Sequence, residues 1–223
     1  QTSQDGCGPA NAELDIRQGV PIVAGDSFCS DSRYAATWVQ QWAGAWVSLG
    51  GAGSHYADAP SPRKYALGAD GQNLSLAVIS ENAAWDGVEL TLFQRREEDW
   101  LPIGGPVNDP LSFLPSTTFS LAFVQNIPTL AFQQGGIQAK QWNGEAWVSL
   151  GTSLSQDGVD PALMEVNGSP TLAFSGSSVQ VWNWNGAAWT QKGQDLNQTS
   201  GAFSWSTSLA ASDQRLYAAW IEN

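Results

Sequence analysis

One phrase occurs twice in this chain of 223 residues, as QWAGAWVSLG at residues 41–50 and as QWNGEAWVSLG at residues 141–151. Weaker copies read FQRREEDWLPIG at 93–104 and NWNGAAWTQKG at 183–193. The second tryptophans of the four phrases, Trp46, Trp100, Trp147 and Trp189, follow one another at intervals of 54, 47 and 42 residues. An internal repeat of about 40–50 residues is typical of β-propeller blades, each built from four strands.

The rest of the repeating unit follows each phrase. A first segment of small or alternating apolar residues recurs at 63–70, 117–124, 160–166 and 206–213, and a second at 73–80, 127–134, 169–176 and 215–222. The second segment contains PTLAF at both 128–132 and 170–174. The N-terminal stretch 11–27 aligns with 161–177 as a further hairpin of the same kind. The segments are short, rich in β-branched and aromatic residues, and bounded by turn residues, which predicts strands rather than helices.

The sequence therefore predicts an all-β fold, a small β-propeller of four to five blades in one domain over 1–223. We expect four-stranded antiparallel blades in units 11–50, 63–104, 117–151 and 160–193, with an incomplete half-unit at 206–222. The Asn-Gly pairs at 143–144 and 185–186 lie between the last two strands of a unit, where we expect tight turns with positive φ.

The first and second segments of each unit form a predicted hairpin, and the sequence contains five such hairpins. It contains only four Trp phrases, because no phrase follows the last hairpin. Two arrangements fit: a fifth blade that is only two strands wide, which we prefer, or a four-bladed ring that displaces one hairpin. An unpaired strand edge invites pairing with another chain. We therefore expect a candidate assembly edge along the last strand, with the side chains Leu216, Tyr217, Trp220 and Ile221. The pairing within one molecule or between molecules stays open. Trp220 occupies the position of Phe132 and Phe174, which predicts that it also belongs to the core.

The formal net charge of −12 disfavours nucleic acid and anionic membrane surfaces as partners, because both attract basic proteins. The chain begins at Gln1 without Met, which we interpret as removal of a signal peptide, and we expect a secreted, extracellular or cell-surface protein.

The two cysteines of the chain lie equally far from Gln18, the expected centre of the first hairpin turn. The sequence thus predicts that Cys7 and Cys29 face each other and form a disulfide. Three N-glycosylation sequons begin at Asn73, Asn167 and Asn197, and their occupancy stays open.

The sequence offers little for catalysis. Its one histidine, His55, lies in a predicted loop, and no nucleophile-elbow phrase occurs. The acidic run Glu97, Glu98 and Asp99 reads as a solvated turn, and the sialidase phrase SxDxGxTW is absent. We therefore expect no enzyme activity, no cofactor and no metal site.

The unit VxxWNGxxWVxLG…SPTLAF resembles the tryptophan-rich β-propeller repeats of secreted bacterial proteins, over residues 11–222. The resemblance is clear in the third and fourth units and weak in the second, where residues 95–99 replace the Trp-Asn-Gly turn. More distantly, the chain is similar in architecture to the five-bladed lectins of the tachylectin type. Architecture alone does not transmit function.

Aromatic residues that recur in register are expected to pack the blades, whereas those that the repeat does not require are candidates for a binding surface. The latter are Trp38, Trp85, Trp182 and Trp205. We expect a non-catalytic interaction or structural protein, an adhesion, surface or filament component, that assembles with itself as an oligomer or polymer or binds an extracellular glycan or protein. A glycan-binding lectin is the alternative, and a propeller hydrolase of the glycosidase type is disfavoured.

Overall fold

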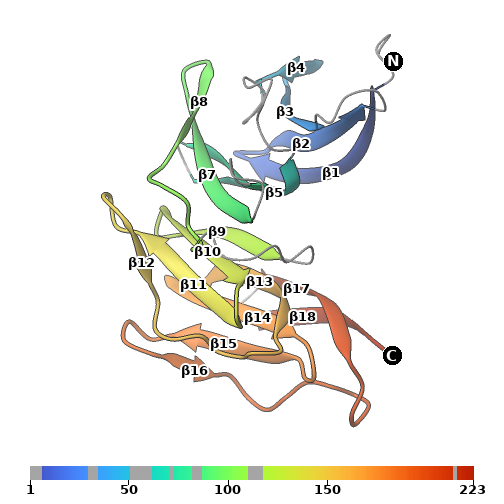
Figure 1. The fold of residues 1–223 in the computed structure, drawn as a ribbon, viewed down its shortest axis with the longest axis vertical. Coiled ribbons are helices and arrows are strands. Elements are labelled where there is room, and N and C mark those ends of the chain that lie inside the picture. Colours follow the sequence, from blue (N-terminus) through green and yellow to red (C-terminus); the bar gives the residue numbers. More distant parts are fainter. Residues whose placement is uncertain are drawn as a thin grey trace. The chain divides into compact units, whose positions relative to one another are not determined.

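The computed structural model describes residues 7–29, 35–50, 62–70, 73–81, 87–109, 118–212 and 215–223 (Figure 1). These residues form eighteen β-strands and no helix, so the part of the chain that is described contains no helix long and apolar enough to cross a membrane. The chain divides into two compact units, Gln1–Pro115 and Ser116–Asn223, and each is described by itself.

The first unit contains two four-stranded antiparallel sheets, blade A with the strand order β1-β2-β3-β4 and blade B with β5-β6-β7-β8. The strands are β1 Cys7–Arg17, β2 Val20–Cys29, β3 Ala35–Trp42, β4 Trp46–Ser48, β5 Pro62–Ala69, β6 Leu74–Glu81, β7 Val88–Arg96 and β8 Asp99–Pro102.

The second unit contains two further four-stranded sheets, blade C with β9 to β12 and blade D with β13 to β16, followed by a two-stranded hairpin, blade E. The strands are β9 Phe119–Val124, β10 Ile127–Gln133, β11 Ile137–Trp142, β12 Trp147–Ser149, β13 Val159–Val166, β14 Ser169–Ser175, β15 Gln180–Trp184, β16 Trp189–Gln191, β17 Ser204–Ser212 and β18 Arg215–Glu222. The expected four-stranded antiparallel blades and the incomplete C-terminal half-blade are confirmed.

The register of the first hairpin differs from the expectation near its turn and agrees with it at the cysteines. Gln18 and Gly19 form a two-residue turn with φ of 49° and 79°, so Arg17 pairs with Val20 and the centre lies between residues 18 and 19. An irregularity between Pro9 and Ala12 then shifts the register, and Cys7 pairs with Cys29. The backbone thus places the two cysteines opposite each other, and the disulfide itself stays a prediction.

The turns between the last two strands are wider than expected. Trp142 pairs with Trp147 and Trp184 with Trp189, which leaves four residues in each loop. In each Asn-Gly pair only the glycine has positive φ, 102° at Gly144 and 97° at Gly186. The asparagine instead caps the loop, since the side chain of Asn143 accepts the N–H groups of Glu145 and Ala146.

The second strands of the complete blades form the core. Leu76 of β6, Leu130 of β10 and Leu172 of β14 are fully buried, and each lies between two neighbouring strands of its own sheet. Burial of such a side chain stabilises the fold by about 1.5–3 kcal/mol. The PTLAF repeat therefore marks the most deeply buried strand of blades C and D.

Neighbouring blades within each unit are joined by hydrogen bonds at equivalent positions. The backbone N–H of Leu67 in blade B donates to Glu13 Oε2 of blade A at 3.1 Å, and Leu163 of blade D donates to Ser120 Oγ of blade C at 3.0 Å. The paired strands show that Leu67 corresponds to Leu163 and Glu13 to Ser120. One position of the repeat thus supplies an acceptor to the next blade.

The outer strands repeat a second link between blades. The indole N–H of Trp189 donates to the backbone oxygen of Leu150 at 2.6 Å, and Trp100 donates to Leu49 at 2.9 Å. Leu49 and Leu150 are the same residue of the phrase WVSLG in the first and third copies. The repeated tryptophan therefore anchors each of these outer strands to the preceding blade.

Glu13 links the pH to the stability of the first unit. Burial raises the pKa of Glu13 above its ordinary value of 4.5, the hydrogen bond from Leu67 opposes the rise, and Asp15 adds to it. The folded state therefore holds the proton more tightly than the unfolded state. The stability that protonated Glu13 contributes to the folded state is fully present below pH 4.5. It is lost as the pH rises through the raised pKa of Glu13 in the folded protein.

We expect Glu13→Gln to raise the melting temperature at neutral pH, because glutamine keeps an acceptor for Leu67 and carries no charge. The gain over the wild type should shrink below pH 4.5, where Glu13 is protonated. Glu13→Leu is the matched control, since it leaves the buried N–H of Leu67 unpaired and should cost about 1–3 kcal/mol. Melting curves of the three proteins across the acid range measure both effects. A Glu13→Gln protein less stable than the wild type at neutral pH would contradict this account.

Candidate functional site

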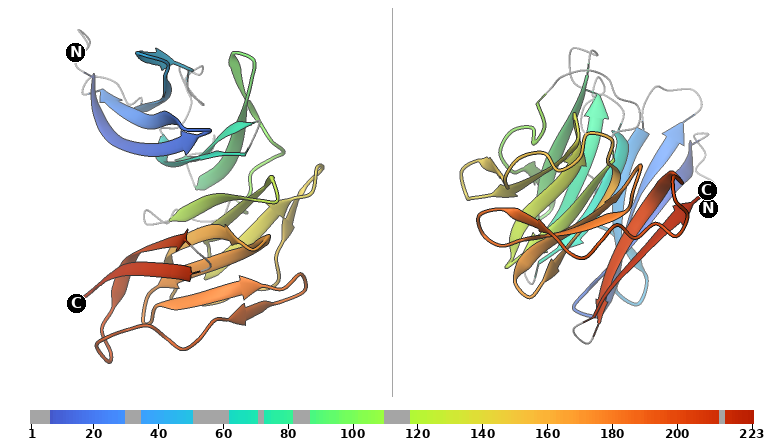
Figure 2. Two further views of the ribbon diagram at one scale, coloured as in Figure 1. Left: turned by 180° about the vertical axis from the view of Figure 1, so that it is seen from behind. Right: turned by 90° about the horizontal axis from the view of Figure 1, so that it is seen from below.

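The C-terminal hairpin leaves one strand edge without a neighbour in its sheet. Within the described part of the Ser116–Asn223 unit, β18 pairs with β17 alone, whereas the second strand of every other described sheet lies between two strands. Contacts with blade D come through β17, which packs against β13 and β14. Figure 2 shows this hairpin in red beside the sheet of blade D. The backbone N–H and C=O groups along the outer edge of β18 can accept a further strand.

Burial separates β18 from its counterpart in blade D. Residues 170–175 of β14 are all buried, whereas no residue of β18 is, and its side chains alternate between exposed and half-buried. By register Trp220 corresponds to Phe174, which is 1% exposed. The expectation that Trp220 belongs to the core therefore holds only in part. The physical reason is that no third or fourth strand covers β18.

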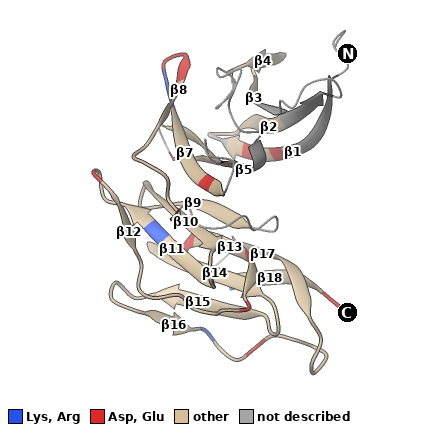
Figure 3. Cartoon of the chain, in the orientation of Figure 1, with Lys and Arg blue, Asp and Glu red and all other residues tan. Residues whose placement is uncertain are grey.

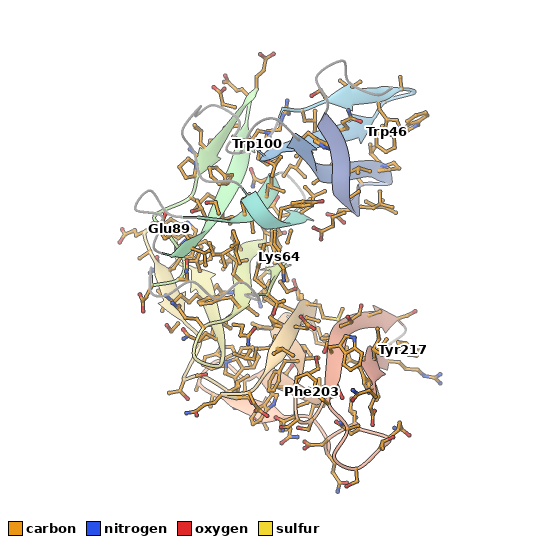
Figure 4. The ribbon with its side chains drawn as sticks, turned by 45° about the vertical axis from the view of Figure 1, so that its right-hand side comes forward. Trp46, Lys64, Glu89, Trp100, Phe203 and Tyr217 are labelled. Carbon is orange, nitrogen blue, oxygen red and sulfur yellow. The ribbon has the colours of Figure 1, made fainter. Side chains whose placement is uncertain are left out.

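The side chains along this edge are apolar and uncharged between its two ends. Tyr217 is 51% and Ile221 50% exposed, on the same face of the strand, and Figure 4 shows Tyr217 at the surface of the hairpin. Leu216, Ala218 and Trp220 face the other side and are half-buried. No charged residue lies between Arg215 and Glu222, and Figure 3 draws most of the hairpin in tan, the colour of uncharged residues.

Glu222 fixes the end of β18 to the connection from blade D. Its carboxylate accepts the indole N–H of Trp220 at 2.9 Å and the backbone N–H groups of Gln198 and Thr199. These hydrogen bonds, that from Trp220 first, hold the pKa of Glu222 below its ordinary value. The edge strand is therefore held in place at its C-terminal end.

The three described candidate binding tryptophans each make contacts within their own unit. Trp38 of β3 lies opposite Gly25, where a Cβ would overlap the Trp38 indole, so Trp38 fills the space that phenylalanine fills in blades C and D. Trp182 is half-buried, donates to Gln180 Oε1 at 3.1 Å and packs on the core of the second unit. Trp205 is half-buried in β17 opposite Ile221. Trp85 lies outside the described residues.

The acidic run of the first unit lies at an exposed turn. Glu97, Glu98 and Asp99 are exposed at the turn between β7 and β8, as expected. No group of three His, Cys, Asp or Glu side chains that could hold a metal ion occurs within the described ranges. His55 lies outside them.

A groove between blades C and D was not predicted from the sequence. Its volume is about 250 Å³ and it opens where the first turns of both blades meet the last turn of blade D. It is lined by Val124, Gln125, Ile127, Gln141, Gly168, Ser169, Pro170, Trp184, Asn185 and Gly186. Trp184 recurs in register with Trp142, so the sequence predicts that it packs the blade, and nothing within one repeat distinguishes a second role.

Comparison with known proteins supports the fold. No protein-family model and no curated protein matches the sequence. A crystal structure of the fungal lectin from Aleuria aurantia, described as a six-bladed β-propeller, matches with a TM-score of 0.58 and 13% identity over 97% of this chain and 72% of the lectin. A second structure of that fucose-specific lectin matches with a TM-score of 0.57 and 12% identity, over the same shares.

A sialidase from Trypanosoma rangeli, in complex with 2,3-difluorosialic acid, matches with a TM-score of 0.60 and 13% identity over 96% of this chain. The chain spans 43% of the length of that sialidase. At these identities the likeness shows the fold alone. The fold is a β-propeller, as the sequence predicted, and its neighbours include both a sugar-binding protein and an enzyme.

Proposed function

We propose that this chain is a non-catalytic interaction propeller, secreted or displayed at a cell surface, that assembles with itself through the open edge of β18. The single observation that carries the proposal is that β18 has one paired edge and no buried side chain, while the equivalent β14 is enclosed. The non-catalytic part rests on the sequence, which contains one histidine and no nucleophile-elbow phrase.

A second copy of the chain is the occupant that the charges favour. With a net charge of −12 two copies repel each other, and a self-contact is least costly where charge is absent. The edge from Leu216 to Ile221 is such a segment. Antiparallel pairing of two β18 strands would also bring Arg215 of one copy near Glu222 of the other. Because both copies use the same edge, the contact closes as a two-fold dimer and not as a filament.

Light scattering of the purified protein tests this association. The wild type should have about twice the monomer mass of 23.8 kDa at high concentration. Tyr217→Lys and Ile221→Lys should each give the monomer, because lysine side chains on an edge strand oppose its pairing with a second strand. Val148→Lys in β12 is the matched control, since Val148 is 46% exposed on another outer strand, and it should leave the dimer intact. A wild type that stays monomeric at every concentration would refute self-assembly.

Glycan binding is the second candidate function, and the groove between blades C and D favours it. The groove combines an indole, a proline and side-chain amides, which is the chemistry of sugar-binding sites. The likeness to a fucose-specific lectin is consistent with this function. A glycan array that includes fucosides tests it on the intact chain: bound glycans support the lectin, and an empty array refutes it.

A further inference from the structure

We propose that the groove between blades C and D binds one neutral sugar ring, which stacks on the indole of Trp184 and donates and accepts hydrogen bonds with the surrounding amides. This inference rests on the second proposed function and names the site and the ligand class. The groove of about 250 Å³ is smaller than the roughly 300–1,000 Å³ that drug-sized ligands occupy. One ring, and not an extended oligosaccharide, therefore fits inside it.

The stacking platform is held in place before any ligand binds. The rings of Trp184 and Trp189 are tilted by 58° with their centroids 5.5 Å apart. Trp189 is in turn anchored to Leu150 of blade C through its indole N–H. A ring that is already fixed loses little conformational entropy on binding, which favours affinity for a small ligand. The C–H face of a sugar can lie against such an indole.

The amides around the indole are oriented with hydrogen-bonding groups to spare. Asn185 Oδ1 accepts the N–H groups of Ala187 and Ala188 at 3.0 and 2.9 Å, which directs its NH₂ group away from the loop. Gln141 donates to Thr129 Oγ1 at 3.0 Å, and one N–H and the carbonyl oxygen of its amide remain for a ligand. Such paired donors and acceptors match the hydroxyl groups of a sugar.

The absence of charge in the lining selects a neutral ligand. None of the residues that line the groove is ionised. The carboxylate of Glu165 lies at the rim, where it accepts the N–H of the lining residue Gln125 at 2.9 Å. Together with the net charge of −12, this carboxylate disfavours sugars that carry an acid group.

Blade B shows what replaces the indole elsewhere in the chain. Arg95 pairs with Trp100 in blade B at the register where Trp184 pairs with Trp189 in blade D. The same sheet geometry thus accommodates arginine opposite the anchoring tryptophan. Trp184→Arg therefore removes the platform by a substitution that the repeat itself contains.

Two-dimensional NMR of the ¹⁵N-labelled full chain tests the site with methyl β-D-galactoside and methyl α-D-mannoside as neutral probes and N-acetylneuraminic acid as the acidic one. At least one neutral probe should shift the indole N–H signal of Trp184, and the acidic probe should not. Binding should be about tenfold or more weaker in Trp184→Arg, which lacks the platform, and in Asn185→Asp, which keeps the loop cap but adds charge.

Two results would overturn the proposal: no shift with either neutral probe, or equal binding by the wild type and both variants. Stronger binding of N-acetylneuraminic acid than of the neutral probes would contradict the ligand class. Tyr217→Lys separates this site from self-assembly, because the variant should lose the dimer and keep the sugar affinity. A glycan array that is positive while Trp184 is silent would place glycan binding elsewhere and refute only this site.

Discussion

Phe174→Ala is expected to lower the free energy of unfolding of the Ser116–Asn223 unit by about 3–5 kcal/mol. Phe174 is 1% exposed in the middle of blade D, so its removal leaves a cavity that the sheet cannot close. The equivalent change in the last hairpin, Trp220→Ala, should cost only about 1–2 kcal/mol in the monomer. The larger side chain thus gives the smaller effect, because β18 has no covering strands. Guanidinium denaturation followed by near-ultraviolet circular dichroism measures both.

The difference between the losses in free energy of unfolding for Phe174→Ala and Trp220→Ala measures how far the side chains of blade E are exposed to solvent. It is best measured in the Tyr217→Lys background, in which association does not contribute. Similar costs for the two substitutions would mean that β18 is covered in solution. That result would contradict the open edge on which the proposed assembly depends.

Trp189→Phe is expected to destabilise the same unit by about 1–3 kcal/mol, because the backbone oxygen of Leu150 loses its donor inside the protein. Phenylalanine retains most of the ring, so the loss measures mainly the hydrogen bond of 2.6 Å and not the packing. Trp46→Phe is the matched control, since Trp46 is the corresponding residue of blade A and is 47% exposed. Its cost should stay within about 0.5 kcal/mol.

The denaturation midpoints of these two variants, compared at an unchanged m-value, test the link between blades. An equal loss in Trp46→Phe would show that the effect comes from the indole ring and its local surroundings. The interblade hydrogen bond would then contribute nothing measurable to stability. Trp100→Phe provides a second copy of the experiment in the first unit, where the acceptor is Leu49.

The repeat predicted the sheets because each copy contains the same buried strand. Leu130 and Leu172 recur in PTLAF and occupy the same enclosed position in blades C and D. The missing phrase after the last hairpin likewise predicted the two-stranded blade E. The strands within a single repeat, and the number of strands in each blade, could therefore be predicted from the sequence.

Features that depend on a neighbour were not readable from one repeat. Trp38 looked unnecessary to its strand, but it compensates for Gly25 on the adjacent strand, and this glycine was the available signal. The groove is formed by turns of two successive blades, so no motif within one repeat predicts it. Trp220 has the sequence position of a core residue without the strands that would bury it. In each case the physical cause lies across a strand or a blade boundary.

The open edge of β18 is tested most directly by hydrogen–deuterium exchange of residues 215–222 at low and at high protein concentration. At low concentration these amides should exchange much faster than those of residues 169–175 in the enclosed β14. The reason is that the N–H groups along the outer edge of β18 have no partner strand in the sheet. At high concentration they should become protected in the wild type and stay unprotected in Tyr217→Lys. Protection of β18 that equals that of β14 at low concentration, or that never changes with concentration, would contradict the account.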